Sequence, residues 1–239
     1  MALYRIADFL FDIVPRYDLL ARVCEPYRTA EGGTPDLRIE ISEQQLREAA
    51  QRDTEHSVAY AESLCVCRAV SQYAAEHGVI LFHAAAVEVD GKAYAFSAPS
   101  GTGKSTHIRL WRRVYGARVE IINGDKPLLR EKEGVLTVYG TPWCGKEGWH
   151  RNTSAPLAGL CFIERAEKNG IRRMESSEAV ERIFSQLLKP ASPDGVAETL
   201  RIADLLIRNV PIFLLGCDVS DEAAKTSFTA MVEGENNEN

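Results

Sequence analysis

The sequence predicts an α/β fold with a mixed, partly antiparallel sheet, in which a glycine-rich loop is entered from a β-hairpin. Two apolar runs, Ile80–Val89 and Ala93–Ser97, meet at Asp90 and Gly91, a pair typical of hairpin turns. The glycine-rich segment Ala98–Thr106 follows directly, and apolar runs then alternate with helical patterns along the chain. A parallel β–α–β unit would instead place a helix between the two strands.

The first 45 residues indicate an irregular, β-rich leader. Strand character is found in Tyr4–Val14 and in Leu37–Ile41, and the turn-prone residues 31–35 lie between them. We expect this leader to cover one face of the main sheet. A role in gripping a partner is the alternative.

A long helical stretch follows, from Ser42 to His77, with a break predicted near residues 52–55. Its second half, Val58–Ala75, is apolar around most of its circumference, which indicates a buried helix. Gly78 is a natural C-terminal stop.

These patterns divide the chain into three parts. Residues 1–75 are predicted to form the β-rich leader plus helices that pack on a core domain. Residues 76–232 are predicted to form that domain, which carries the glycine-rich loop. Residues 233–239 are polar and are predicted to be a disordered tail.

The segment Ala98–Thr106 reads A-P-S-G-T-G-K-S-T and fits the phosphate-binding (P-loop, or Walker A) pattern A/G-x4-G-K-S/T. Backbone N–H groups without bulky side chains can wrap a polyphosphate, and the following helix points its partial positive end at the same place. The Lys104 ammonium suits the outer phosphates, and the Ser105 hydroxyl suits Mg²⁺. The predicted nucleotide-binding residues are Ser100, Gly101, Thr102, Gly103, Lys104, Ser105 and Thr106.

A helix is predicted over Thr106–Tyr115, followed by an apolar strand over Arg118–Asp125. An aspartate at the end of such a strand, beside a phosphate loop, is where Mg²⁺ needs a ligand or a hydroxyl needs a base. Asp125 lies 21 positions after Lys104 (125 − 104), which leaves room for one helix and one return strand. The two residues are therefore predicted to belong to adjacent strands. An ordinary Asp-Lys-Pro turn is the alternative.

A second hairpin is predicted over Lys126–Tyr139, and a loop over Gly140–Asn152 follows it. This loop combines glycine, tryptophan and charged residues, which suits a lid or a substrate-gripping loop. The alternative is a surface loop whose tryptophans pack inward. The residues predicted to contact substrate are Lys146, Glu147, His150 and Arg151.

The remainder is predicted to be scaffold. Apolar runs predict strands at Ala155–Glu164, Ile171–Met174 and Val210–Leu215, and helices are predicted to start at Ser176 (ending before Pro190), at Asp194 and after Ser220.

Composition narrows the partner classes. The 239 residues carry a net charge of −6, so neither nucleic acid nor an anionic membrane is expected as a partner. The six cysteines include no C-x-x-C pair and no zinc-like spacing, which is typical of free thiols in the cytoplasm. No run approaches 18 apolar residues, so no membrane span is expected. The sequence leaves open whether the chain forms a homo-oligomer.

One combination of features resembles a known family. His83, the hairpin, Ala98–Thr106, the short helix and the N-G-D-K segment Asn123–Lys126 are similar to the catalytic domain of HPr kinase/phosphorylase and its relatives. These proteins share a fold with phosphoenolpyruvate carboxykinases. The resemblance covers roughly Val79–Cys217 and identifies residues 76–232 as a small P-loop kinase-like domain.

The resemblance implies a kinase that uses ATP and Mg²⁺ to phosphorylate a hydroxyl-bearing substrate, either a serine of a peptide or protein or a small metabolite. It implies that Lys104 binds phosphate, that Ser105 binds Mg²⁺, and that Asp125 ligates the metal or assists the hydroxyl. It also places His83 near the active site. Read without the resemblance, His83 is a satisfied core histidine.

The sequence departs from the family at the strand end. The family often has paired aspartates there, whereas here Gly124 precedes Asp125 and Lys126 follows it. The P-V-x-x-G-R segment linked to phosphorylase activity is absent, and residues 1–75 are unlike the family's N-terminal domain, so HPr itself is not the expected substrate. A non-catalytic ATP-binding module for sensing or assembly is the alternative function. If Asp125 replaces the second aspartate, the alternative bases are His83, Glu147 and His150.

Overall fold

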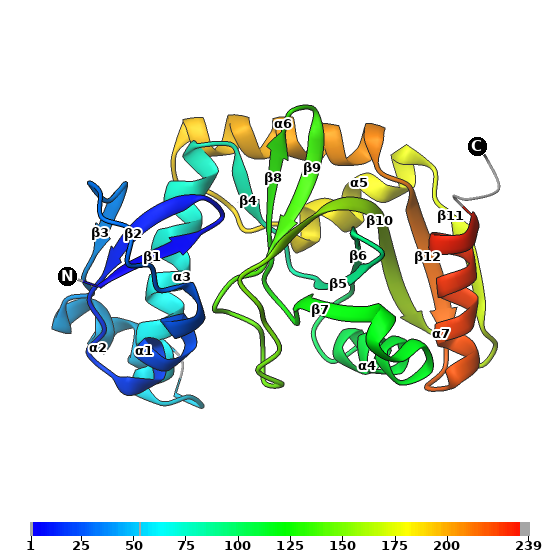
Figure 1. The fold of residues 1–239 in the computed structure, drawn as a ribbon, viewed down its shortest axis with the longest axis horizontal. Helices are drawn as coiled ribbons and strands as arrows, with labels where there is room; N and C mark the ends of the chain where they lie inside the picture. Colours follow the sequence, from blue (N-terminus) through cyan, green and yellow to red (C-terminus); the bar gives the residue numbers. More distant parts are fainter. Residues whose placement is uncertain (1, 53, 235–239) are drawn as a thin grey trace.

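The structure is a computed structural model that describes residues 2–52 and 54–234. Within these residues the chain forms a three-stranded and a nine-stranded sheet, both of mixed strand direction. Figure 1 shows the small sheet with α1–α3 at one end of the molecule and the large, curled sheet between two groups of helices. The α/β class and the mixed, partly antiparallel sheet are as the sequence predicts.

The small sheet contains a hairpin that the sequence reading missed. Strands β1 (Leu3–Ile6) and β2 (Phe9–Ile13) pair antiparallel, and β3 (Leu37–Ile39) adds to β2 in parallel. Ala7 and Asp8 turn the chain with φ values of 50° and 69°. The single strand-like run predicted for this region is therefore two strands.

A short helix, α1 (Asp18–Cys24), also lies inside the predicted β-rich leader. Its N-terminus is fixed from a distance, because the buried Glu62 carboxylate accepts hydrogen bonds from the backbone N–H groups of Arg16 (2.7 Å) and Tyr17 (3.1 Å). Glu62 belongs to α3 (Val58–Glu76), so the two helices are held together.

The helix pair α2 (Glu43–Arg52) and α3 agrees with the predicted helical stretch. Ser57 caps α3 by accepting from the N–H of Tyr60. The break predicted near residues 52–55 includes residue 53, which lies outside the described residues.

The predicted hairpin at Asp90 and Gly91 is confirmed. Strands β5 (Ala85–Val89) and β6 (Lys92–Ser97) pair antiparallel, and the two turn residues have φ values of 51° and 80°. These left-handed conformations suit a two-residue hairpin turn, which explains the Asp-Gly pair.

The first strand of that hairpin is shorter than predicted. Residues 79–81 form a separate strand, β4 (Val79–Leu81), which pairs with β8 (Leu128–Lys132) in another part of the sheet. The chain leaves β4 and enters β5 through residues 82–84, so His83 lies in a connection between two strands rather than on one.

The large sheet has the strand order β4-β8-β9-β10-β6-β5-β7. Strand β7 (Val119–Asn123) pairs with β5 and not with β6, the strand that leads into the glycine-rich loop. The prediction that Lys104 and Asp125 follow adjacent strands is therefore wrong. Because the hairpin already places β5 beside β6, the return strand after α4 joins the outer side of β5.

Strand β10 (Ser154–Arg165) joins the two halves of the large sheet. Its first residues pair antiparallel with β9 (Val135–Tyr139), and its later residues pair in parallel with β6 and with β12 (Ile212–Cys217). Strand β11 (Gly170–Arg173) completes this edge against β12.

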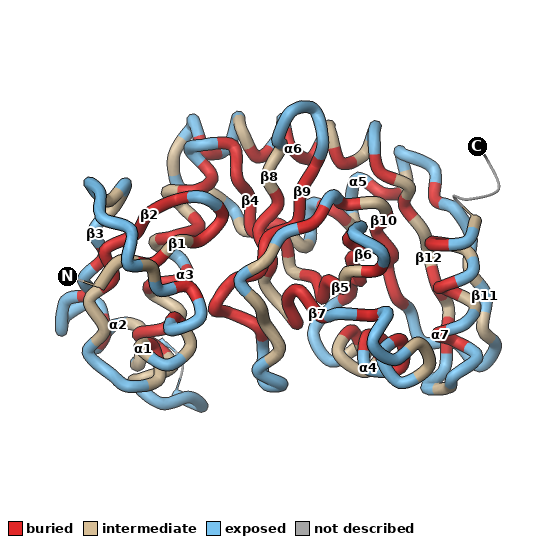
Figure 2. Tube along the Cα trace, in the orientation of Figure 1, coloured by how far each residue is buried: buried red, intermediate tan, exposed pale blue. Residues whose placement is uncertain are grey.

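The two faces of the sheet carry different cores because side chains alternate along each strand. On β6 the small Ala93 and Ala95 belong to the core that contains α5 and α6, whereas the large Tyr94 and Phe96 belong to the core that contains α4 and α7. Figure 2 shows buried residues concentrated along these strands and α3. The helices are α4 (Lys104–Tyr115), α5 (Ser176–Gln186), α6 (Pro193–Asn209) and α7 (Asp221–Phe228).

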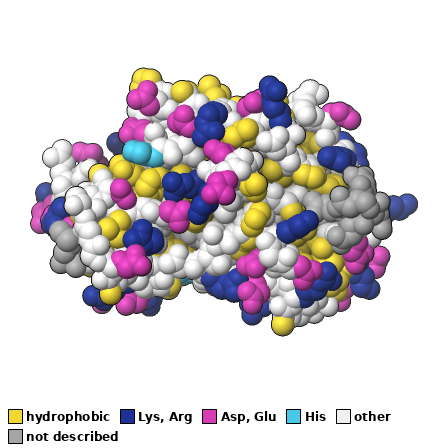
Figure 3. All heavy atoms as spheres, turned by 45° about the horizontal axis from the view of Figure 1, so that its top comes forward, with side chains coloured by type: hydrophobic (Ala, Val, Ile, Leu, Met, Phe, Trp, Pro, Cys, Tyr) yellow, Lys and Arg dark blue, Asp and Glu magenta, His cyan; other side chains and the backbone are white. Residues whose placement is uncertain are grey.

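The chain's C-terminal end continues as a π-helical turn, Thr229–Glu233, so Glu233 lies in a helical element rather than in the predicted tail. Residues 235–239 of that tail lie outside the described residues. In Figure 3, basic and acidic side chains are interspersed over the face that is drawn. Among the described residues, no helix is long and apolar enough to cross a membrane.

Candidate functional site

The glycine-rich loop connects the end of β6 at Ser97 to the start of α4 at Lys104. Gly101 and Gly103 adopt φ values of +79° and +128°, which residues with a Cβ rarely reach. Among the described residues no side chain caps the N-terminus of α4. The first backbone N–H groups of the helix therefore remain available to an anion.

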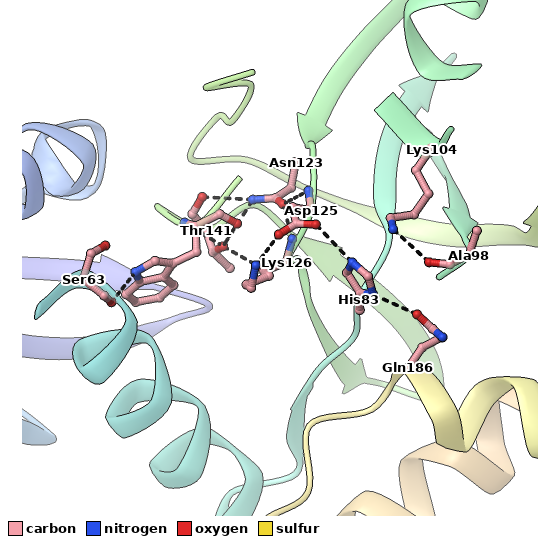
Figure 4. A network of polar contacts seen from close by, with 10 residues as sticks. Ser63, His83, Ala98, Lys104, Asn123, Asp125, Lys126, Thr141 and Gln186 are labelled. Atoms are coloured by element: carbon pink, nitrogen blue, oxygen red, sulfur yellow. Dashed lines mark hydrogen bonds and ion pairs between the residues drawn. The ribbon is translucent and has the colours of Figure 1, made fainter. Parts of the chain in front are cut away.

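Lys104 is the first residue of α4, and its side chain reaches back into this loop. The residue is 7% exposed, and its Nζ donates to the carbonyl oxygen of Ala98 at 2.8 Å. Burial lowers the pKa of the ammonium group, and the charge of Asp125 opposes that shift. Figure 4 shows the ammonium at Ala98 on the same side of the site as His83.

The turn after β7 is built by Asn123, which is fully buried. Its Oδ1 accepts from the backbone N–H groups of Asp125 (2.9 Å) and Lys126 (2.7 Å), and its Nδ2 donates to the Thr141 carbonyl oxygen (2.9 Å). This side-chain turn fixes the direction of the Asp125 carboxylate and ties it to the loop that follows β9.

The Asp125 carboxylate has a cationic partner on one oxygen and an imidazole on the other. Lys126 Nζ contacts Oδ2, and His83 Nε2 lies 3.2 Å from Oδ1. Burial raises the pKa of Asp125, but the hydrogen bond from His83 and the charge of Lys126 outweigh that effect and lower the pKa to about 2. Asp125 is thus ionised at neutral pH.

His83 is held on both sides. Its Nδ1 lies 2.8 Å from Gln186 Oε1, and the orientation of this amide is set by its Nε2, which donates to Ser185 Oγ. Both ring nitrogens therefore face oxygen atoms, of Gln186 on one side and of Asp125 on the other. His83 lines the cavity and is 29% exposed, which differs from a core histidine.

These groups surround one cavity of about 1150 Å³. Its walls are the glycine-rich loop, the turn after β7, the loop after β9, and the faces of α1 and α3. The predicted site residues that it brings together are His83, Ser100, Gly101, Gly103, Lys104, Ser105, Thr106, Asp125, Lys146, Glu147 and His150.

Two predicted site residues do not line the cavity. Thr102 is not among the cavity-lining residues, and its N–H donates to the Pro99 carbonyl oxygen within the loop. Arg151 also lies outside the cavity lining, because its guanidinium pairs with Glu120 and Glu88 on the large sheet. The predicted substrate contact of Arg151 is therefore not supported by its position.

The loop after β9 combines the two alternatives that the sequence left open, an inward-packed tryptophan and a segment that lines the cavity. Trp143 is buried and its Nε1 donates to the Ser63 carbonyl oxygen of α3 at 2.9 Å, so this tryptophan packs inward. The segment beyond it carries the exposed Lys146 and Glu147, which line the cavity. His150 stacks on Tyr27, with ring centroids 5.6 Å apart, and this contact ties the far end of the loop to the N-terminal unit.

Glycines let the two ends of this loop approach each other and let the loop pack against the turn that carries Asp125. A Cβ on Gly140 would lie 1.9 Å from the Arg151 carbonyl oxygen, and a Cβ on Gly124 would lie 2.6 Å from the Cys144 carbonyl oxygen. Gly124 is thus required by backbone contact.

Sequence reasoning missed three contributors to the site. Arg165, at the end of β10, donates to the carbonyl oxygens of Gly101 (2.6 Å) and Thr102 (3.5 Å) and so braces the glycine-rich loop. Gln186 orients His83 from the end of α5. The third is the cavity wall from α1 and α3. Each contributor lies far along the chain from the motif it serves, so no local pattern indicates it.

A bound Mg²⁺ would need ligands from a nucleotide as well as from the protein. No group of three or more His, Cys, Asp or Glu residues able to hold a metal is found in residues 2–52 and 54–234. Ser105 and Asp125 line the same cavity. One hydroxyl and one carboxylate suit Mg²⁺, which keeps several waters and takes substrate phosphates as further ligands.

Comparison with known proteins gives a distant structural similarity. The chain matches no family model and no curated protein. Among solved structures it is similar to the HPr(Ser) kinase/phosphatase from Coxiella burnetii, with a TM-score of 0.38 and 10% sequence identity over 65% of this chain and 98% of that chain. The relationship is structural and distant.

Proposed function

We propose that the protein is an ATP- and Mg²⁺-dependent kinase that transfers the γ-phosphate to a hydroxyl group of a peptide, a protein or a small metabolite. The observation that carries this proposal is the shared cavity, which the glycine-rich loop, Lys104, Asp125 and His83 all line. Phosphoryl transfer depends mainly on positioning and charge neutralisation, and these groups supply both. The sequence resemblance to HPr kinase/phosphorylase supports the same reaction class.

In this proposal the glycine-rich loop binds the phosphates through its backbone N–H groups. Lys104 exchanges its contact with the Ala98 carbonyl for a phosphate oxygen. Ser105 and Asp125 would hold Mg²⁺, which neutralises phosphate charge when it is bound. Arg165 keeps the loop in position from outside the cavity.

Asp125 acts on the acceptor hydroxyl, and His83 positions the Asp125 carboxylate. A carboxyl group whose pKa is about 2 is a weak base, so Asp125 orients the hydroxyl and takes its proton only as the new bond forms. The acceptor oxygen bonds to the γ-phosphorus while the bond to the β,γ-bridging oxygen breaks, and the proton passes to Asp125 and then to water. His83 fixes the carboxylate through the 3.2 Å contact.

The test is transfer of labelled γ-phosphate from ATP to panels of hydroxyl-bearing peptides and metabolites, including an extract of the cells that make the protein. The wild-type protein should label at least one acceptor, and Lys104→Ala should abolish the product. Lys225→Ala is the matched control, because Lys225 pairs with Glu222 on the surface of α7. Equal labelling by wild type and Lys104→Ala would refute the kinase assignment.

A second candidate function is ATP binding without transfer, in a sensing or assembly role. The observation that favours it is the ion pair of Lys126 with Asp125, because an ammonium group already neutralises the carboxylate that a metal or a hydroxyl would need. This candidate predicts thermal stabilisation by ATP with no phosphorylated product from any extract. A labelled product that depends on Asp125 would exclude it.

A further inference from the structure

The cavity is larger than a single ligand requires. Its volume of about 1150 Å³ exceeds the roughly 300–1,000 Å³ that is common for small-molecule and cofactor sites. The glycine-rich loop and the turn after β7 occupy one part of its lining, and helices of the N-terminal unit supply another part. The cavity therefore has room for a second reactant beside a nucleotide, and the helices of the N-terminal unit would contact that second reactant.

Helix α1 presents one face to this cavity. Leu19, Arg22 and Val23 line it, and their i, i+3, i+4 spacing places them on one side of the helix. Leu20 and Cys24, on the other side, are fully buried in the N-terminal core. The helix thus has a core face and a cavity face.

Helix α3 repeats this arrangement. Tyr60, Ser63 and Leu64 line the cavity with the same i, i+3, i+4 spacing. Leu64 and Tyr60 are only half-buried, as are Leu19 and Val23 on α1. Together the two helices expose a small apolar surface inside the cavity, which an apolar group of a ligand would cover.

Arg22 is the charged group of this surface. Its side chain is exposed, and within residues 2–52 and 54–234 it forms no ion pair. A guanidinium offers a planar pair of donors that matches a carboxylate. Other arginines of the same unit are already paired: Arg5 with Glu31, Arg28 with Glu25, and Arg38 with Asp12.

The surface is held in place before any ligand binds. The buried Glu62 carboxylate on α3 binds the backbone at the start of α1, and Trp143 binds the Ser63 carbonyl oxygen. Helices α1 and α3 and the loop after β9 are therefore linked by direct hydrogen bonds. A preformed surface binds a ligand without the entropy loss of ordering itself.

We infer that these residues of α1 and α3, named here the acceptor wall, bind the phosphate acceptor, and that the acceptor carries a carboxylate beside an apolar group. The inference rests on the proposed function and names its substrate class. Arg22 binds the carboxylate, and Leu19, Val23 and Leu64 contact the apolar group. The hydroxyl of the same molecule then extends toward Asp125.

The test measures peptide binding in the presence of Mg·ADP, so that no transfer takes place. The probes are N-acetylated peptides with one serine and one leucine, separated by zero to three glycines, each made as a C-terminal carboxylate and as an amide. A third form places an aspartate in the amidated peptide and thus separates a terminal from a side-chain carboxylate. At least one carboxylate form should bind about tenfold more tightly than its amide.

Three variants locate the effect. Arg22→Gln should remove the preference for the carboxylate form while the affinity for Mg·ADP changes far less, and Arg22→Lys should restore part of the preference. Arg28→Gln is the matched control and should keep the full preference, because Arg28 pairs with Glu25 outside the cavity lining.

Equal binding of all carboxylate and amide pairs would overturn the inference and leave the proposed function standing. A preference that persists in Arg22→Gln would also overturn it, and so would a loss of Mg·ADP binding in Arg22→Gln as large as the loss of peptide binding. If the wild-type protein binds no nucleotide at all, the proposed function and this inference both fail.

Discussion

The two sides of the cavity differ in how their charged groups are engaged. On one side, which we name the nucleotide wall, are the glycine-rich loop, His83 and the turn after β7. There Lys104 is bound to the Ala98 carbonyl oxygen, and Asp125 is bound to Lys126 and His83. On the acceptor wall, Arg22 has no ion pair among the described residues and lies beside half-buried apolar side chains.

This difference predicts that ligands bind to the two walls in different ways. A ligand at the nucleotide wall must replace existing contacts, so affinity there depends on exchange of one charged partner for another. A ligand at the acceptor wall adds contacts to a surface that is already fixed. Changes at the nucleotide wall are therefore expected to have the larger effects, and changes behind the acceptor wall to act first on stability.

The largest effect is expected at Asp125. Asp125→Asn removes the charge to which the proposed function assigns the orientation of the acceptor hydroxyl and the binding of Mg²⁺, so transfer should fall about 1,000-fold. The measurement is the initial rate of labelled phosphate transfer at saturating Mg·ATP. Asp204→Asn is the control, because Asp204 pairs with Arg208 on α6, outside the cavity lining. A rate within threefold of wild type would remove Asp125 from the mechanism.

Acid should lower the free energy of unfolding through the same residue, Asp125. The pKa of Asp125 falls from 3.8 to about 2 in the folded protein, so its ionised form stabilises the fold by about 2 kcal/mol above pH 4. Because the folded pKa is the lower one, this contribution is lost as the pH falls from about 4 to about 2.

Urea unfolding of wild type and Asp125→Asn over this pH range measures the contribution. The difference in free energy of unfolding between the two proteins should shrink as the pH falls. A difference that stays constant from pH 5 to pH 2.5 would contradict the ion pair with Lys126 and the contact with His83.

A change at Glu62, which lies behind the acceptor wall, should reduce the stability of the fold. Glu62→Gln removes the charge and replaces one carboxylate oxygen with an NH2 group, so the backbone N–H of either Arg16 or Tyr17 loses its acceptor. The free energy of unfolding should fall by about 2 kcal/mol. Glu48→Gln is the control, since Glu48 is exposed on α2 and accepts from Gln44. If both variants unfold at the same urea concentration as wild type, Glu62 does not anchor α1.

The smallest effect is expected at Arg165, a positioning residue. It contacts only carbonyl oxygens of the glycine-rich loop and is exposed, so Arg165→Gln should weaken ATP binding by about threefold. Thermal unfolding without ATP should not change. Arg172→Gln, which removes the pair with Glu178, serves as the comparison variant. A loss of stability without any loss of affinity would show that Arg165 supports the fold and not the loop.

The nucleotide wall is more predictable from the sequence than the acceptor wall, for a physical reason. The turn at Asp90 and Gly91 and the glycines at 101 and 103 meet local backbone requirements, which neighbouring residues encode. The order of the strands is not local: β5 separates β6 from β7, so the expected adjacency was wrong. The position of Arg151, paired with acidic residues of the sheet, depends on the same long-range packing.

The acceptor wall depends on contacts between distant parts of the chain. Helix α1 has seven residues and no side-chain cap of its own, and Glu62 fixes its start from α3. A short helix of this kind gives little periodic signal, which is why the sequence indicated only a β-rich leader. The ion pair of Lys126 with Asp125 joins neighbours in the chain, but its geometry is set by the buried Asn123.

Calorimetric titration with ATP and Mg²⁺ measures whether the nucleotide wall binds a triphosphate. The wild-type protein should bind one ATP per chain, and Lys104→Ala should weaken that binding by at least about 100-fold. No binding by the wild-type protein, or equal affinity in Lys104→Ala, would contradict the account.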